Sequence, residues 1–459
     1  MIDNIINDIN SKEKVLILGF GREGKSTYKL IRKYLKDKKL TIGDANEELI
    51  NNNPDLKEDH NLEFVLGDSY LDDLDSYDLI IKSPGVNFKH VNYDDFKDKI
   101  TSQIDLFLKH ANCLTIGVTG TKGKSTTASL IYHVLGGLGK KTLLVGNIGI
   151  PVFDKIDDIT YDTLVVLELS CHQLQFVKAS PNIGILLNLY EEHLDLYKSY
   201  NDYIQAKLNI FKYQKENDYN VWGLDSPDSL KSFSSNKNTY CFSTDIKKVK
   251  KGIVIKDEGL YLVKNNNSSL IYDCNRKRKL LGKHNLYNVA ATFCVSDILG
   301  LDMNKTADLV DDFKPLEHRM ELVGTYDGIT FYNDSIATIP EATINCIKSI
   351  PNVQTVIIGG MDRGVDLSSL IAYLNDNKKL KTLIFLKDTG YKIHDELNKL
   401  GCKKTLIKAV DMKDAVTKAY KLTGKNKACV LSPAAASYNV YKNFEERGKD
   451  YKRLIKELG

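Results

Sequence analysis

The chain has 459 residues, which is long for one domain, so we expect roughly two to four domains. Hydrophobic residues make up 42% and charged residues 27% of the chain, as in soluble globular proteins. The 64 basic and 60 acidic residues leave a formal charge of +4, too small to indicate a nucleic acid as a partner. The amino terminus has no long apolar run and the 8 cysteines include no C-x-x-C pair, so we expect a cytoplasmic protein with reduced thiols and no membrane insertion.

The first segment alternates short apolar strands with helices, and its first strand runs into Gly19-Phe20-Gly21-Arg22-Glu23-Gly24. The strands expected here cover residues 15–18, 40–42 and 79–81. Asp44 follows the second strand, about 20 residues after the glycines, where a ribose-binding carboxylate is needed. This order predicts a Rossmann-like unit whose glycine loop binds the sugar and diphosphate of a nucleotide, with a purely structural turn as the alternative.

A second glycine-rich loop, Gly120-Thr121-Lys122-Gly123-Lys124-Ser125-Thr126, lies between an apolar strand and an apolar-periodic helix. This order is typical of a phosphate-binding loop, in which glycines turn backbone N–H groups toward the phosphates and a helix N-terminus adds positive potential. Lys124 is expected to reach the terminal phosphates and Ser125 to hold Mg²⁺. We therefore predict that this loop holds ATP.

The first glycine loop competes for the same role. The strict pattern G-x-x-x-x-G-K-[ST] is met at Gly19–Ser26, whereas Val118 stands at the first glycine position of the central loop. Pattern matching alone would therefore select the first loop, and the choice depends on what surrounds each one.

Further apolar runs after the central loop, residues 142–145, 163–169 and 183–189, predict parallel strands buried on both faces. Ligands bind at the carboxyl ends of such strands, and these ends carry Asn147, Glu168 and His193. Glu168 offers the oxygen ligand that Mg²⁺ prefers, and His193 suits a second metal position where Mn²⁺ also fits. Each residue alone is more often an ordinary hydrogen-bonded group, so the prediction of a metal site rests on their combination with the phosphate loop.

Lys207 lies in the middle of an expected helix, in Tyr203-Ile204-Gln205-Ala206-Lys207-Leu208. Apolar neighbours would bury it and lower its pKa, because desolvation disfavours the ammonium. A surface lysine that lays its stem along the helix remains the alternative.

A third α/β segment follows Lys314-Pro315, with expected strands at residues 329–332, 355–358, 382–386 and 428–431. The predicted fold class is thus α/β with three domains. They are a Rossmann-like domain at residues 1–97, a central P-loop ATPase-like domain with a parallel sheet at 98–315, and a Rossmann-like α/β domain at 316–459.

Together these motifs resemble the Mur ligase family. The resemblance spans nearly the whole chain and is carried by Ser83-Pro84-Gly85, Thr119–Thr126, Gly146-Asn147-Ile148-Gly149, Glu168-Leu169-Ser170, His193, Tyr203–Lys207, Gly282-Lys283-His284-Asn285, His318-Arg319-Met320-Glu321, Leu431–Ser437, Phe444 and Arg447-Gly448. The set of motifs is highly specific, whereas no single one of them is.

The resemblance implies a role for each matched position. The ATP site would comprise Gly120, Thr121, Lys122, Gly123, Lys124, Ser125, Thr126, Asn285, Asn288, Arg319 and Asp334. The catalytic and metal-binding groups would be Lys124, Ser125, Glu168, His193 and Lys207, the last as a carbamate that turns a buried ammonium into an anionic ligand. The substrate sites would comprise Gly19, Gly21, Gly24, Asp44 and Gly85 for a UDP group, Asn147 and Ser170 along the substrate, and Thr338, Arg363, Ser437, Tyr438 and Phe444 around an amino acid.

The activity implied by the resemblance is amide formation driven by ATP with two Mg²⁺ ions. The expected substrates are UDP-N-acetylmuramoyl-L-alanine and glutamate, D-glutamate first, joined through an acyl phosphate in peptidoglycan precursor synthesis. We expect a monomer that closes its domains to keep water from the acyl phosphate.

Two positions depart from the family pattern for D-glutamate. Ile336 stands in Asn333-Asp334-Ser335-Ile336-Ala337-Thr338, and Arg363 in Gly359-Gly360-Met361-Asp362-Arg363-Gly364, where lysines are expected. Because a hydrogen bond to a charged group contributes about 1.5–3 kcal/mol, losing one cation changes how a dianionic amino acid is held. The same chemistry with L-glutamate or another amino acid therefore stays open.

Two other functions also remain open. A folylpolyglutamate synthase would share the central domain but lacks a Rossmann-like first domain. A dinucleotide-binding sensor or dehydrogenase would use Gly19–Gly24 and would bind NAD(H) without needing Lys124.

Overall fold

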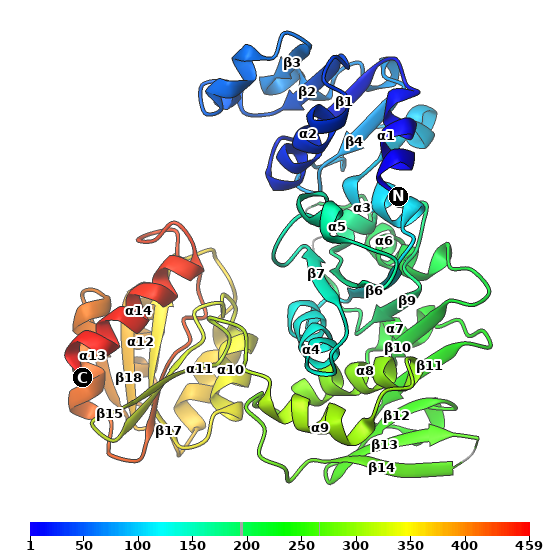
Figure 1. The fold of residues 1–459 in the computed structure, drawn as a ribbon. Coiled ribbons are helices and arrows are strands. Elements are labelled where there is room, and N and C mark those ends of the chain that lie inside the picture. The colour runs from blue at the N-terminus through cyan, green and yellow to red at the C-terminus, as the bar shows by residue number, and fades with distance from the viewer. Residues whose placement is uncertain (193–195, 266) are drawn as a thin grey trace. The chain divides into compact units, whose positions relative to one another are not determined.

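A computed structural model describes residues 1–192, 196–265 and 267–459. The described residues contain three β-sheets. The chain forms two compact units: the first comprises Met1–Arg276 and Tyr287–Val310, and the second Lys277–Leu286 and Asp311–Gly459. Figure 1 shows the first unit in blue to green and most of the second in yellow to red. The domain boundaries at residues 97 and 315 stay predictions.

The amino-terminal sheet of the first unit is parallel, with strand order β3-β2-β1-β4-β5. Its strands are β1 (Val15–Leu18), β2 (Leu40–Asp44), β3 (Leu62–Leu66), β4 (Leu79–Lys82) and β5 (Ile100–Thr101). Its helices are α1 (Ile2–Asn10), α2 (Arg22–Tyr34) and α3 (Gln103–His110). The buried residues of β1 lie on both sides of the sheet, as the continuous apolar run predicts.

The second sheet of this unit has the order β14-β13-β12-β11-β10-β9-β6-β8-β7 and is parallel except for β13 and β14. Its strands are β6 (Leu114–Thr119), β7 (Thr142–Gly146), β8 (Leu164–Glu168), β9 (Ile183–Leu186), β10 (Tyr219–Gly223), β11 (Thr239–Ser243), β12 (Gly252–Ile255), β13 (Gly259–Lys264) and β14 (Asn267–Asp273). The helices along this part of the chain are α4 (Lys124–Gly137), α5 (Cys171–Leu174), α6 (Tyr200–Lys212), α7 (Pro227–Ser232), α8 (Asn285–Ile298) and α9 (Met303–Asp312).

The sheet of the second unit has the order β15-β16-β20-β17-β18-β19, and only β15 is antiparallel to its neighbour. Its strands are β15 (Glu321–Tyr326), β16 (Ile329–Asn333), β17 (Val353–Gly360), β18 (Thr382–Asp388), β19 (Thr405–Lys408) and β20 (Ala428–Leu431). Its helices are α10 (Pro340–Ser349), α11 (Ser368–Asp376), α12 (Thr389–Lys399), α13 (Met412–Leu422) and α14 (Phe444–Leu458).

The strand register places several polar groups at one edge of the central sheet. Val118 in β6 lies opposite Glu168 in β8, and Glu168 lies opposite Gly146 in β7. The central glycine loop, Asn147 and Glu168 therefore share the carboxyl edge of three adjacent strands, where ligands bind in parallel α/β sheets.

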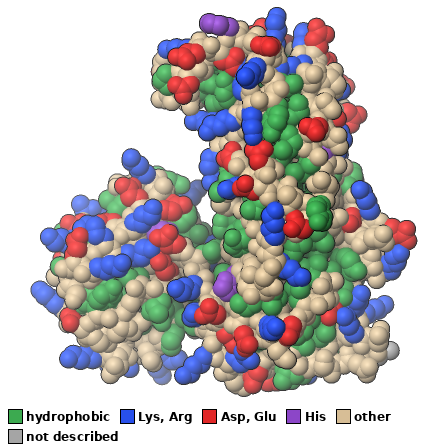
Figure 2. Space-filling model, in the orientation of Figure 1, with side chains coloured by type: hydrophobic (Ala, Val, Ile, Leu, Met, Phe, Trp, Pro, Cys, Tyr) green, Lys and Arg blue, Asp and Glu red, His purple; other side chains and the backbone are tan. Residues whose placement is uncertain are grey.

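Basic and acidic side chains are intermixed over the visible face of each unit, without a large area of one sign (Figure 2). Among the described residues, no helix has both the length and the apolar character needed to cross a membrane.

Candidate active site

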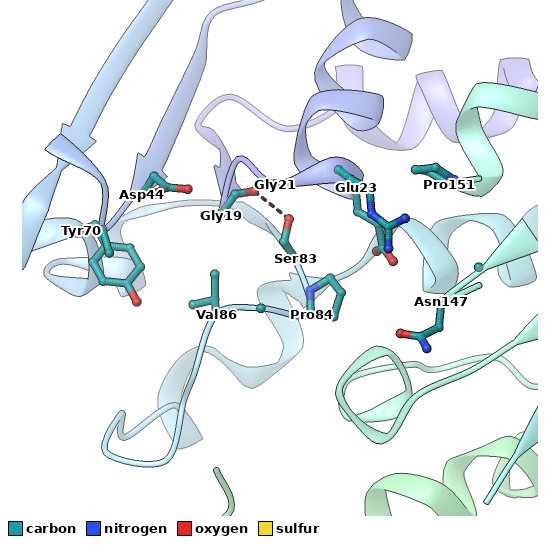
Figure 3. A pocket seen from close by; sticks show the side chains of 14 residues that line it. Gly19, Gly21, Glu23, Asp44, Tyr70, Ser83, Pro84, Val86, Asn147 and Pro151 are labelled. Carbon is teal, nitrogen blue, oxygen red and sulfur yellow. Dashed lines mark hydrogen bonds between the residues drawn. The ribbon is translucent and has the colours of Figure 1, made fainter. Parts of the chain in front are cut away.

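The first glycine loop borders a cavity of about 380 Å³ in the first unit. Asp44 and Tyr70 lie at one end of it and Asn147 and Pro151 at the other, with Gly19 and Gly21 between them (Figure 3). Gly85 also lines it, so of the predicted UDP-site positions only Gly24 is not part of the wall. The cavity joins β1, β2 and β4 of the first sheet to the end of β7 in the second.

The geometry of this loop explains its glycines and its strict motif. Gly19 has a φ of +86°, and a Cβ on Gly24 would lie 2.1 Å from the carbonyl oxygen of Gly19. Helix α2 therefore starts directly against β1, as in a Rossmann turn, rather than after a long phosphate-wrapping loop. Lys25 is exposed on the helix and is not part of the cavity wall, so the strict pattern does not place a lysine at this site.

Asp44 and Ser83 fix the shape of the loop. The backbone N–H of Phe20 donates to Asp44 Oδ2 at 2.7 Å, and the hydroxyl of Ser83 donates to the carbonyl oxygen of Gly19 at 2.6 Å. One carboxylate oxygen of Asp44 thus holds the loop, and Asp44 also lines the cavity.

Two buried charged groups near this cavity were not singled out from the sequence. Gln173 Nε2 donates to Glu23 Oε1 at 2.6 Å, while Glu23 Oε2 is buried without a hydrogen-bond partner, and burial raises the pKa of this carboxyl group. Burial lowers the pKa of Lys82 to about 8, and its ammonium lies 5.2 Å from the ring centre of Phe88. No local pattern marks these residues, because only the packing of the first two sheets buries them.

The central loop has the backbone geometry of an anion site. Gly120 and Gly123 have φ values of +150° and +92°, and no side chain caps the N-terminus of α4. Lys124 Nζ donates to the carbonyl oxygens of Gly120 and Thr121, each at 3.0 Å, and burial lowers its pKa. The loop is thus pre-shaped, with its lysine folded over it and its first helical N–H groups free of side-chain caps.

The other predicted loop residues have distinct settings. Lys122 is exposed and its ammonium lies 2.6 Å from Glu192 Oε1, whereas Thr126 is buried at the start of α4. The hydroxyl of Ser125, in the first helical turn, makes no hydrogen bond to any described residue and is accessible to a ligand.

Lys207 is buried, so the alternative of a surface lysine is wrong. Its ammonium donates to the carbonyl oxygen of Gly120 at 2.9 Å and lies 4.8 Å from the ring centre of Tyr203. The hydroxyl of Tyr203 is 2.8 Å from Thr121 Oγ1. Burial, and then the charge of Lys124, lower the pKa of Lys207 to about 7, so much of it is the neutral amine near neutral pH.

Glu168 lies at the end of β8 with 1% of its surface exposed. Asn147 Nδ2 donates to Oε1 at 2.9 Å, but Oε2 has no hydrogen-bond partner. A buried carboxylate oxygen without a partner, beside the phosphate loop, is what an oxygen-preferring divalent cation requires. His193, the predicted second ligand, lies outside the described residues.

Two other predicted residues serve the local structure. The hydroxyl of Ser170 accepts the N–H of Gln173 at 3.2 Å and caps α5. Asn288 Oδ1 accepts the hydroxyl of Thr127 at 3.0 Å and lies so close to the loop that a Cβ on Gly123 would be 2.5 Å away. Asn288 therefore packs against the phosphate loop in the first unit.

The second unit holds Asn285, Arg319 and Asp334. Asn285 Nδ2 donates to the carbonyl oxygen of Leu281 at 2.6 Å. Arg319 is flanked by His318 and Met320, whose φ values of +64° and +45° are left-handed and strained for such side chains. Asp334 Oδ1 accepts the N–H of Met320 at 3.1 Å, so this carboxylate holds the turn that presents Arg319.

The pH dependence of stability gives a test of this buried carboxylate. Burial raises the pKa of Asp334 from 3.8 to about 6, even though the hydroxyl of Ser432 donates to it. Between these values the folded state keeps a proton that the unfolded chain has released, so this group's contribution to stability falls as pH rises and is constant above the folded pKa. Asp334→Asn removes this contribution, so between about pH 4.5 and about pH 7 we expect the unfolding free energy of wild type to change by roughly 1–2 kcal/mol in the unfavourable direction relative to that of the variant.

Urea unfolding of both proteins at the two pH values measures this effect. Asp376→Asn, an exposed position in the same unit, is the matched control. The same pH dependence in wild type and Asp334→Asn would show that Asp334 is ionised in both states.

The residues predicted for an amino acid are only partly brought together. Thr338 and Arg363 line one small cavity together with Ala434, Ala435 and Ala436. The guanidinium of Arg363 is exposed and makes no hydrogen bond or ion pair to the described residues, so it can receive a carboxylate. Ser437, Tyr438 and Phe444 are not part of this wall, and their substrate contacts stay predictions.

Comparison with known proteins identifies the chain. A model described as the Mur ligase middle domain matches residues 118–296, and one described as the Mur ligase, glutamate ligase domain matches residues 318–435. A protein from Clostridium botulinum named UDP-N-acetylmuramoylalanine–D-glutamate ligase is 33% identical over 98% of both chains. The chain belongs to the Mur ligase family.

Two further matches extend the comparison, one in sequence and one in fold. A protein of the same name from Clostridium kluyveri is 34% identical over 88% of both chains. The crystal structure of the UDP-N-acetylmuramate-alanine ligase MurC from Thermotoga maritima has a TM-score of 0.58 at 19% identity, covering 97% of this chain and 100% of that one, which shows a shared fold. The predicted family and the α/β fold class are confirmed.

Membership also bears on the two glycine loops. The Mur ligase middle domain begins at residue 118, so it contains the central loop, whereas Gly19–Ser26 lies outside both matched domains. The family match thus agrees with the geometry in favouring the central loop as the phosphate site.

Proposed function

We propose that this Mur ligase uses ATP to join D-glutamate to UDP-N-acetylmuramoyl-L-alanine. The observation that carries the proposal is the position of Asn147, which lines the nucleotide-sized cavity and donates to Glu168 at the edge that carries the phosphate loop. A substrate held in the cavity therefore ends beside the site where a γ-phosphate is expected. The two Clostridium relatives named for this reaction support the choice of substrates.

The proposed reaction has two steps. The carboxylate of the alanyl substrate attacks the γ-phosphorus of ATP, the bond to the bridging oxygen breaks, and ADP leaves behind an acyl phosphate. The amine of glutamate then attacks the acyl carbon, phosphate departs, and the amine proton is lost as the amide forms. Catalysis depends on positioning and on compensating the charge of the phosphoryl oxygens.

The chain's own residues supply most of that compensation. The ammonium of Lys124 donates to two loop carbonyl groups, and in the proposed complex it would donate to the phosphates of ATP instead. The uncapped N–H groups at the start of α4 would donate to the same phosphates. The unpartnered Glu168 oxygen and the Ser125 hydroxyl would hold one Mg²⁺, and carbamylated Lys207 with His193 would hold a second metal ion, Mg²⁺ or Mn²⁺. Such ions neutralise charge on the phosphoryl oxygens.

Asp44 at one end of the cavity suits the ribose of the UDP group, and the glycine turn in the middle of the cavity suits its diphosphate. Asn285 and Asn288 are proposed for the adenine region, and Arg319 for the ATP phosphates. We also propose that the enzyme acts as a cytoplasmic monomer with three domains at residues 1–97, 98–315 and 316–459.

A second candidate differs only in the amino acid. Ile336 is partly buried and offers no charge, which leaves Arg363 as the side-chain cation in the wall of the small cavity. An arginine fork binds a carboxylate with a different reach from that of lysine, so L-glutamate or another amino acid is the alternative substrate.

Product formation with each glutamate enantiomer tests the proposed function. With ATP, Mg²⁺ and UDP-N-acetylmuramoyl-L-alanine, we expect phosphate release and a product of the correct mass with D-glutamate, because the relatives act in that reaction by name. L-Glutamate in place of D-glutamate is the matched control. Product with L-glutamate alone would establish the alternative, and no product with either would overturn the proposal.

A further inference from the structure

Arg447 is a buried cation without an anionic partner among the described residues. It comes from the first turn of α14, and only 1% of its surface is exposed. Its guanidinium donates to Ser335 Oγ at 3.0 Å and to the carbonyl oxygens of Ser335, Ala435 and Ala436 at 2.8, 3.0 and 3.1 Å. All of these acceptors are neutral, although buried charges are usually paired with opposite charge.

The contacts of Arg447 join three segments that follow strands of the second sheet. Ser335 follows β16, and Ala435 and Ala436 follow β20. The third segment follows β17: the N–H of Met361 donates to the carbonyl oxygen of Ala436 at 2.9 Å. A Cβ on Gly360 would lie 2.8 Å from Arg447 Nη1, so only glycine fits beside the guanidinium.

These segments also form the wall of the small cavity that contains Thr338 and Arg363. Met361, Ala435 and Ala436 all line that cavity, so Arg447 lies directly behind its wall. Burial lowers the pKa of Arg447 to about 10, which leaves the guanidinium charged at neutral pH. A permanent positive charge therefore stands one residue away from the site proposed for a dicarboxylate amino acid.

We propose that Arg447 is a positioning residue for the amino-acid substrate, fixing the cavity wall and supplying the buried positive charge that Ile336 does not provide. This inference rests on the proposed function, since it assumes that the cavity receives an anionic amino acid. The guanidinium reaches the substrate through Ala435 and Ala436 and does not touch it. Its fork matters as well as its charge, because one ammonium cannot hold three carbonyl groups in a fixed plane.

Substitution of Arg447 by lysine tests the contribution of the guanidinium fork. Arg447→Lys keeps the charge and loses the fork, and we expect the KM for the amino acid to rise roughly 10-fold to 100-fold, as for the loss of hydrogen bonds to a charged group. The KM values for ATP and the UDP substrate should stay within about 2-fold, because those sites do not involve this wall. Lys449→Met, an exposed position on the same helix, is the matched control and should match wild type.

A second measurement tests the positioning role without activity. Amide hydrogen exchange at residues 433–437 should be faster in Arg447→Lys than in wild type, because the guanidinium bonds to two carbonyl groups of that segment, Ala435 and Ala436, are lost. Ser335→Ala removes the bond from Arg447 Nε and the hydroxyl's own bond to the carbonyl oxygen of Phe444, but it keeps the three guanidinium bonds to carbonyl oxygens. It should raise the amino-acid KM less, which keeps the test open if larger changes prevent folding.

The outcomes distinguish this inference from the function on which it rests. An unchanged amino-acid KM, an equal rise in all three KM values, or unchanged exchange at residues 433–437 would overturn the role of Arg447 while leaving the ligase activity intact. Absence of product in wild type with either glutamate would overturn the proposed function instead, and exchange would still report whether Arg447 fixes the wall.

Discussion

Replacing Lys124 with alanine is expected to lower turnover by about 10²–10³-fold or more, because the ammonium compensates charge that develops on the transferred phosphoryl group. The lysine lies over its own loop, where its ammonium donates to the carbonyl oxygens of Gly120 and Thr121. Phosphate release under saturating substrates measures the loss. Calorimetric binding of the UDP substrate should be unchanged, because we propose that this substrate binds in the cavity of the first glycine loop.

Lys25→Ala is the matched control for this prediction. Lys25 belongs to the strict phosphate-loop pattern yet is exposed on α2, so we expect wild-type turnover. A large loss in Lys25→Ala together with an active Lys124→Ala would contradict our assignment of the two loops. NAD(H) binding at Gly19–Gly24 would then support the dinucleotide-binding alternative.

Lys207→Ala should lower turnover by roughly 10²-fold, with partial recovery in the presence of short carboxylic acids that take the place of a carbamate. A carbamate forms from the neutral amine, and burial brings the pKa of Lys207 to about 7. Carbamylation should therefore be favoured above that pH and lost below it, as the ammonium returns. Turnover with and without acetate, and ¹³C NMR of wild type in labelled bicarbonate, measure both effects.

Lys212→Ala is the control on the same helix, since Lys212 is exposed near the end of α6. It should keep wild-type turnover and show no response to acetate. A Lys207→Ala variant with full activity, or with a loss that carboxylic acids do not affect, would exclude the carbamate and leave Lys207 as a structural donor to the carbonyl of Gly120.

Two strands whose bounds the sequence predicts correctly are fully buried. The expected strand at 15–18 matches β1 residue for residue, and the expected strand at 428–431 matches β20. The pattern fails for β3, β15 and β19, which all lie at sheet edges and are half-exposed, so their apolar signal is interrupted. It also misses β10 and β11, which lie inside the central sheet but contain polar residues among their apolar ones.

The residues of the candidate site also differ in how far the sequence predicts them. Residues that follow directly from a strand end, such as Asn147 and Glu168, are predictable because parallel strands end at one edge. Glu23 and Arg447 depend on contacts between segments that are 150 and 112 residues apart, with Gln173 and Ser335, and no local pattern contains that information. The sequence is compatible with either a buried or a surface position for Lys207. The contact of its ammonium with the phosphate loop, which the sequence does not contain, distinguishes the two.

The side chain of Asn147 is a shared boundary between the nucleotide-sized cavity and the carboxylate at the end of β8. A small molecule that fills the cavity and displaces this amide would contact Oε1 of Glu168, the oxygen that now accepts from Asn147, without leaving the first unit. Such a compound would compete with two substrates at once. Its affinity would not depend on the second unit, so an inhibitor screen could measure binding to the cavity beside the first glycine loop. Compounds that bind there through Asn147 should bind more weakly to Asn147→Ala, which distinguishes them from non-specific binders.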